Sequence, residues 1–226
     1  MGEPWYYVAM AVAIHPVRAW FDLRYEGLEH IPRTGPAIIA CNHISYLDPL
    51  TTASAVVEAG RRPRFLAKDD LFRIPVVGTV IRGTRQIPVA RGTGSATAAL
   101  AAAERSLAQG EIVVIYPEGT VTTRPDHLPM QGKTGVARLA LSSGVPIIPL
   151  ASWGSQAVWQ KSGKGSLKLG RPVCMRAGRP IEPSVEPGEA VDGEVTRAAT
   201  AEVMAVLTAM VQDLRAAYPR SWSDDG

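Results

Sequence analysis

The sequence predicts a single α/β domain, with a central, largely parallel or mixed sheet flanked by helices. Short apolar runs typical of buried strands alternate along the chain with longer segments of helical periodicity. The length of 226 residues suits one large core, and 46% hydrophobic residues with 20% charged residues is ordinary for a globular protein. We expect the domain over residues 22–226, after an N-terminal membrane-contacting helical segment over residues 1–21.

The N-terminal segment is expected to lie on a membrane surface. Residues 5–14 are nearly all apolar, but ten residues are too few to cross a bilayer, because a transmembrane helix needs about 20. Pro16 is expected to break the segment. Large aromatic side chains suited to an interface stand near its ends: Trp5, Tyr6, Tyr7 and Trp20. The alternative is a helix packed on the protein's own core.

The remaining elements follow from apolar runs and periodicity. The predicted strands are residues 37–41, 64–67, 86–89, 112–116, 145–151 and 173–177. The predicted helices are residues 49–59, 71–81, 95–109, 133–143 and 194–218, the last with a single apolar stripe. Residues 153–168 read as a loop or hairpin without a defined path, and residues 179–193, rich in Pro, Gly and Glu, as a surface loop.

Charge and cysteine content narrow the class of protein. The net charge of +3 suits an acidic ligand or an anionic membrane, and no Lys/Arg run, zinc signature or RNA-reading motif indicates nucleic acid. Cys41 and Cys174 both lie inside apolar runs. We therefore expect two reduced packing residues of a cytoplasmic protein rather than a disulfide.

A histidine and an aspartate follow the first predicted strand. His43 lies where α/β folds place their ligand sites, at a strand end. Asp48, five residues later, can fold back to accept a hydrogen bond from one ring nitrogen of His43, which leaves the other nitrogen as a general base. The arrangement is similar to a Ser-His-Asp triad in which the substrate's own hydroxyl replaces the serine. Asp48-Pro49 is also typical of a helix start, so an N-cap role is equally predicted for Asp48.

Further polar residues stand at other strand ends. Arg91 precedes a glycine-rich helix start, which predicts either an anion site or a solvated charge. In the run Glu118-Gly119-Thr120, the carboxylate can accept from a ligand hydroxyl or pair with an arginine, the glycine permits a tight turn, and the threonine can donate to an oxygen. Lys68 on these grounds is only a lysine at a strand end.

Two other chemistries are poorly supported. A nucleophilic role for Cys41 conflicts with its expected direction into the core, since neighbours in a strand face opposite sides. A metal site drawn from His43, Asp48, Glu118 and His127 lacks compact ligand spacing.

Four blocks within residues 42–149 together resemble the 1-acylglycerol-3-phosphate acyltransferase family. The first is His43 with four residues before Asp48. The others are residues 83–91 (Gly-Thr-Arg-Gln-Ile-Pro-Val-Ala-Arg), residues 116–120 (Tyr-Pro-Glu-Gly-Thr) and residues 145–149 (Val-Pro-Ile-Ile-Pro). A His-x4-Asp spacing alone is a weak signal, whereas four blocks in the same order are specific.

The resemblance implies an enzyme of phospholipid biosynthesis that moves a fatty acyl group from an acyl thioester to a free hydroxyl of lysophosphatidic acid. His43 and Asp48 would be catalytic. The residues implied to bind the acceptor are Lys68, Arg91, Glu118, Gly119 and Thr120. Acyl-CoA or acyl carrier protein would be the co-substrate, and no cofactor or metal is expected. We expect a peripheral or monotopic protein on the cytoplasmic face of the cell membrane.

Departures from the family pattern leave the acceptor open. Val121 stands where the family has arginine, and Ala90 where it has aspartate. Arg124 either reaches back into the gap or is solvated. Glycerol 3-phosphate, another lysophospholipid and a lipid-linked sugar are alternative acceptors, and a thioesterase or a non-catalytic lipid-binding module are alternatives of other kinds. Residues 145–149 are expected to form an apolar wall near the acyl chain.

Overall fold

One seven-stranded sheet, in the order β1-β7-β6-β2-β5-β3-β4, is the centre of the computed structural model, which describes residues 4–90, 95–184 and 192–222. The strands are β1 (Asp22–Glu26), β2 (Ala37–Cys41), β3 (Pro63–Lys68), β4 (Ile87–Val89), β5 (Ile112–Ile115), β6 (Ile147–Trp153) and β7 (Pro172–Ala177). All neighbouring strands are parallel except β6 and β7. The predicted α/β class with a largely parallel sheet is confirmed.

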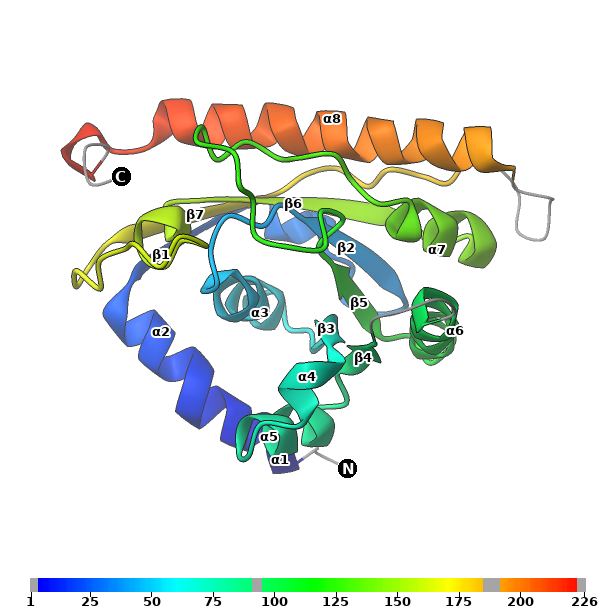
Figure 1. Ribbon diagram of the computed structural model, residues 1–226, viewed down its shortest axis with the longest axis horizontal. Coiled ribbons are helices and arrows are strands. Elements are labelled where there is room, and N and C mark those ends of the chain that lie inside the picture. The colour runs from blue at the N-terminus through cyan, green and yellow to red at the C-terminus, as the bar shows by residue number, and fades with distance from the viewer. Residues whose placement is uncertain (1–3, 91–94, 185–191, 223–226) are drawn as a thin grey trace.

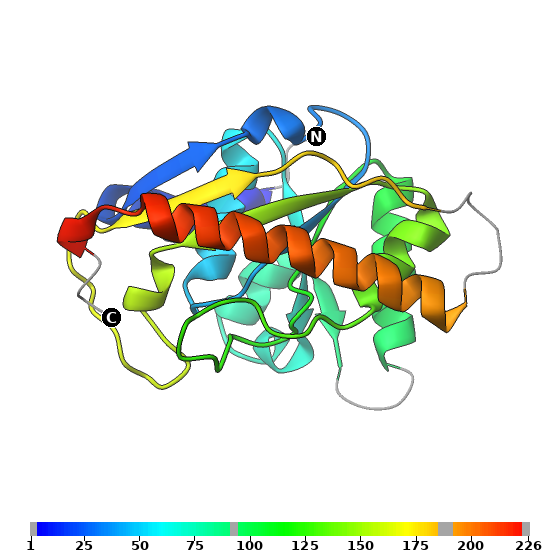
Figure 2. The ribbon, with the colours of Figure 1, turned by 90° about the horizontal axis from the view of Figure 1, so that it is seen from above.

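Helices cover both faces of this sheet, as Figure 1 shows, and α8 crosses it in the view of Figure 2. The residues of β2 contribute alternately to two different core clusters, because neighbouring strand residues face opposite sides. Ile39 and Cys41 belong to the core on the side of α3 (Asp48–Glu58). Ile38 and Ala40 belong to the core on the opposite side, which is covered by α6 (Ser95–Ala108), α7 (Gly135–Ser143) and α8 (Gly193–Ala217).

The N-terminal segment is helical throughout its described length. It consists of α1 (Pro4–Ala9), a π-helical turn η1 (Met10–Ile14) and α2 (His15–Trp20). The expected break at Pro16 is wrong, because proline is tolerated in the first turn of α2 and the π-helical turn before it shifts the hydrogen-bond ladder. Within the described ranges, no helix combines the length and the apolarity needed to cross a membrane.

The segment that follows β3 differs from prediction. Instead of one helix over residues 71–81, it contains α4 (Asp69–Phe72) and α5 (Val77–Gly83). Pro75 lacks a backbone donor, and Val76 has a φ of 66°, which no right-handed helix accommodates. The helix therefore breaks and turns at this point.

The edge strand β1 was not predicted. It pairs in parallel with β7, and its side chains alternate between exposed and half-buried over only five residues. A short alternation of this kind gives a weak period-two signal. Helix α8 does follow its predicted stripe, and Asp192 caps it by accepting from the amides of Glu194 and Val195.

Candidate active site

The carboxyl ends of three adjacent parallel strands meet at one edge of the sheet. His43 follows β2, Glu118 follows β5, and Lys68 ends β3. The structure therefore brings these predicted site residues to the same edge, with β5 lying between His43 and Lys68. The Lys68 side chain is exposed. The predicted site residue Arg91 lies outside the described residues.

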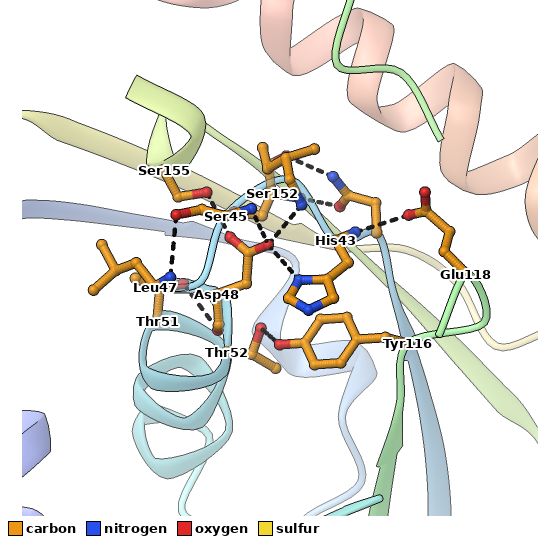
Figure 3. Close-up of polar contacts among 12 residues, drawn as sticks. His43, Ser45, Leu47, Asp48, Thr51, Thr52, Tyr116, Glu118, Ser152 and Ser155 are labelled. Atoms are coloured by element: carbon orange, nitrogen blue, oxygen red, sulfur yellow. Dashed lines mark hydrogen bonds and ion pairs between the residues drawn. The ribbon is translucent and has the colours of Figure 1, made fainter. Parts of the chain in front are cut away.

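His43 and Asp48 form the predicted hydrogen bond. His43 Nδ1 lies 2.9 Å from Asp48 Oδ2 (Figure 3). Because a carboxylate can only accept, Nδ1 carries the proton, and the lone pair of the neutral ring is on Nε2. In the part of the chain that the structure describes, Nε2 has no hydrogen-bond partner, and the side chain is 14% exposed. The free nitrogen has the geometry of a general base that an incoming hydroxyl can reach.

The carboxylate of Asp48 is fully buried and held on both oxygens. Oδ2 also accepts from the backbone amides of Ile44, at 2.7 Å, and Ser45, at 2.8 Å, and Oδ1 accepts from Ser155 Oγ at 2.5 Å. Helix α3 begins at Asp48 itself, with Leu47 in the N-cap position and no side-chain cap. The N-cap interpretation of Asp48 is therefore wrong, because its carboxylate turns back to the loop before the helix.

Tyr116 supports one face of the His43 ring. The two rings stack with centroids 4.3 Å apart and an interplanar angle of 25°. The Tyr116 hydroxyl donates to Thr52 Oγ1 at 3.0 Å, and burial raises the pKa of Tyr116 well above its usual value, so the phenol stays protonated. Stacking on a tyrosine that is itself fixed restricts the orientation of the imidazole.

Glu118 contacts the backbone of the histidine rather than its ring. Oε1 accepts from the His43 amide and Oε2 from the Met130 amide, both at 2.9 Å, and the side chain is 4% exposed. Burial raises the pKa of Glu118, and the two amide hydrogen bonds oppose that effect. The predicted acceptor-binding residue thus already ties the loop of the histidine to the segment before α7.

The next two residues, of which Gly119 is exposed and Thr120 half-buried, form a turn beside His43. Gly119 has a φ of 69°, and a Cβ at this position would lie 2.8 Å from Lys133 Nζ, so glycine is required for both conformation and space. Thr120 Oγ1 accepts from Lys161 Nζ at 3.2 Å. Val121, the next residue, is buried.

The structure also shows where the residues of three other sequence expectations lie. Arg124 does not reach back into the gap, because its guanidinium forms two bonds to the Asp126 carboxylate, at 2.9 and 2.6 Å. Residues 145–149 lie in the core around the start of β6, away from the strand end that faces His43, and their expected contact with the acyl chain stays a prediction. Cys41 is a buried free thiol in the core, and burial raises its pKa.

The loop that supports Asp48 was not predicted. After β6 the chain turns at Gly154, which has a φ of 107°, and presents Ser155 to Asp48. Further along, the Trp159 carbonyl accepts from Ser45 Oγ at 2.9 Å and from the Tyr46 amide at 3.1 Å. The one available signal was the Gly-Ser pair directly after a buried strand, at the same sheet edge as His43.

Comparisons with known proteins show what this chain is similar to. The family model described as Acyltransferase matches residues 22–153. An uncharacterized protein of Mycobacterium tuberculosis is 33% identical over 152 residues, which cover 63% of this chain and 40% of the relative. A chloroplastic 1-acyl-sn-glycerol-3-phosphate acyltransferase of Arabidopsis thaliana is 28% identical over 162 residues, 71% of this chain and 43% of the relative. The chain thus spans less than half the length of these two relatives.

The fold of this chain is also similar to that of a solved structure. The 1-acyl-sn-glycerophosphate acyltransferase PlsC from Thermotoga maritima superposes with a TM-score of 0.67 and 26% sequence identity. The match covers 88% of this chain and 75% of that protein.

Proposed function

This chain belongs to the Acyltransferase family, and from that premise we propose that it acylates a free hydroxyl of 1-acylglycerol 3-phosphate, using an acyl thioester as donor. The observation that carries the proposal is the pairing of His43 with the buried Asp48, which leaves Nε2 available at the sheet edge. The names of the Arabidopsis and Thermotoga proteins support this acceptor.

In the proposed mechanism the acceptor hydroxyl is itself the nucleophile. Its oxygen attacks the thioester carbonyl while His43 Nε2 takes the hydroxyl proton, and Asp48 stabilises the imidazolium that forms. The new C–O bond forms, the C–S bond breaks, and the proton passes from His43 to the departing thiolate. The histidine is then neutral again, and no covalent acyl-enzyme is needed because a thioester is already activated.

Other residues at the sheet edge and beyond it are proposed to bind the substrates. Lys68 and Arg91 would hold the acceptor phosphate, and the turn at Gly119 and Thr120 would position the glycerol. The donor would be acyl-CoA or acyl carrier protein. Glu118 was also expected to bind the glycerol, but its contacts with two backbone amides favour a positioning role.

We also propose that the protein docks on the cytoplasmic face of a membrane, where such acceptors reside. A patch of exposed apolar side chains joins α1 to α4 and α5; we define this docking patch as Trp5, Tyr7, Val8, Leu71, Ile74, Val76 and Val77. Helix α1 packs on α5, with Trp5 against Gly83. Because α4 starts directly after β3, the patch adjoins the sheet edge that carries His43. Large exposed apolar patches are typical of interaction surfaces.

Thiol release from palmitoyl-CoA, with and without lysophosphatidic acid, tests the proposed activity. Release that depends on the acceptor and yields phosphatidic acid is expected, and His43→Gln should lower the rate on the order of 100- to 10,000-fold, because the general base is lost. Circular dichroism and thermal unfolding of the variant control for folding. Equal release without acceptor would instead indicate a thioesterase, and near-wild-type turnover of folded His43→Gln would exclude the mechanism.

A further inference from the structure

Two lysine ammonium groups lie against the turn at Gly119 and Thr120. Lys133 Nζ approaches Gly119 so closely that a Cβ there would be 2.8 Å away, and Lys161 Nζ is 3.2 Å from Thr120 Oγ1. The lysines come from different segments, one just before α7 and the other from the loop after β6. Both side chains are exposed, and across the described ranges neither ammonium has a carboxylate partner. Two unneutralised cations therefore converge on one turn.

The turn offers additional groups to an anion. Thr120 is half-buried and its hydroxyl accepts from Lys161, and no group in the described part of the chain accepts from the Thr120 backbone N–H. The negative charge of Glu118 is directed away, onto the amides of His43 and Met130. Cations beside a free backbone N–H are the usual surroundings of a bound phosphate.

Neighbouring positions supply no competing cation at this turn. Val121 is 1% exposed, and directly after it the Thr122 amide donates to the His43 carbonyl at 2.7 Å, so the chain passes inward here. Arg124 is neutralised by Asp126. Lys133 and Lys161 are thus the cations that the described residues place against the turn.

We propose that Lys133 and Lys161 together bind a phosphate group at this turn and so select a phosphorylated acceptor over a neutral one. The inference rests on the proposed function and adds two residues to Lys68 and Arg91, which are proposed above to hold the same phosphate. The turn adjoins the backbone of His43, so a phosphate held there is close to the base, as the phosphate of a short glycerol unit must be. The phosphates of CoA stand a pantetheine arm away from the reacting carbonyl, which makes them the less suitable source.

Steady-state kinetics of Lys133→Met, Lys161→Met and the double variant test this assignment. Each substitution should raise KM for lysophosphatidic acid about tenfold or more, since charge-assisted contacts to phosphate are among the stronger hydrogen bonds. KM for uncharged 1-monoacylglycerol should not change. Lys164→Met is the matched control, because Lys164 is exposed on the same loop and has no contact with the turn. Palmitoyl-pantetheine, which lacks the CoA phosphates, replaces palmitoyl-CoA in a second set of assays.

A binding assay separates this inference from the proposed activity. Calorimetry with soluble 1-hexanoylglycerol 3-phosphate should show binding to the wild type and to Lys164→Met, and weakening by at least about tenfold in both turn variants. That result without any acyl transfer would refute the proposed function and keep the phosphate site. Unchanged affinity, equal losses with both acceptors, or a KM increase confined to palmitoyl-CoA and absent with palmitoyl-pantetheine would each overturn the assignment.

Discussion

Glu118 illustrates how a residue implied to bind substrate can serve the site in another way. Its two oxygens each accept one backbone N–H, from His43 and from Met130, and the side chain is buried. A carboxylate suits this position because both of its oxygens accept, whereas an amide has only one accepting atom. The identity of the residue thus fixes the backbone from which the His43 side chain projects.

We expect Glu118→Gln to destabilise the protein by about 1–3 kcal/mol, because one buried N–H loses its acceptor. The rate constant kcat should fall, while KM for the acceptor stays within about twofold, as befits a positioning residue. Urea unfolding and steady-state kinetics provide both measurements. An unchanged stability combined with a large increase in acceptor KM would instead establish Glu118 as an acceptor-binding residue.

At the residue scale, spacing was informative where partners are close in the chain. Asp48 lies five residues from His43, so a single loop brings them together, and their hydrogen bond was predictable. Ser155 is 107 residues from Asp48, and Lys133 and Lys161 reach the turn from separate segments. These contacts depend on how loops fold over the sheet edge, which no local period or propensity encodes.

At the scale of elements, the loop over residues 154–170 supports the loop between His43 and Asp48. It contributes the Ser155 hydroxyl to Asp48 and the Trp159 carbonyl to Ser45 and Tyr46. The edge-to-face packing of Tyr46 on Trp159, with ring centroids 5.4 Å apart, adds an apolar contact. The loop therefore contacts Asp48, which also accepts the hydrogen bond from the His43 ring.

Substitution of Ser155 by alanine removes one hydrogen bond to a buried carboxylate. Hydrogen bonds to charged groups contribute roughly 1.5–3 kcal/mol, so kcat should fall about 10- to 100-fold with little change in either KM. Ser155→Cys, which keeps a weak donor, should recover part of the loss. Wild-type kcat in folded Ser155→Ala would show that the loop contact does not position Asp48.

Elements that continuous apolar runs or an apolar stripe mark in the sequence were predictable. Elements that depend on tertiary contacts were not. The buried runs that became β2, β5 and β6 and the apolar stripe of α8 carry clear signals. The edge strand β1 depends on β7 for its hydrogen bonds, and the turn at Val76 adopts a φ that valine rarely takes. Such features depend on contacts between segments that are distant in the sequence.

At the scale of the whole molecule, the parallel sheet places the candidate active site next to the proposed docking patch. The carboxyl ends of β2, β5 and β3 carry His43, the Gly119 turn and Lys68 to one edge. The chain then continues from β3 into α4 and α5, which contribute to the docking patch. One side of the N-terminal helices packs on the core through Ile14 and Val17, and the other side carries exposed apolar residues that we propose to contact a membrane.

The docking patch can be tested without removing any element of the fold. Tyr7 and Val76 are 62% and 75% exposed, so Tyr7→Glu combined with Val76→Glu should leave the core intact. Losing the burial of one large apolar side chain costs roughly 1.5–3 kcal/mol, and the partition coefficient onto anionic vesicles should therefore fall at least about tenfold. Sedimentation with phosphatidylglycerol-containing liposomes measures this quantity.

Ala205→Glu adds a charge to an exposed position of α8, on the opposite face of the sheet from the N-terminal helices, and serves as the control. Acyl transfer to a short-chain acceptor dissolved below its micelle concentration should be the same in the wild type, the patch variant and the control, because the site at His43 is unchanged. Transfer to an acceptor embedded in vesicles should fall only in the patch variant. Vesicle binding that is equal in all three proteins would place the membrane contact elsewhere on the molecule.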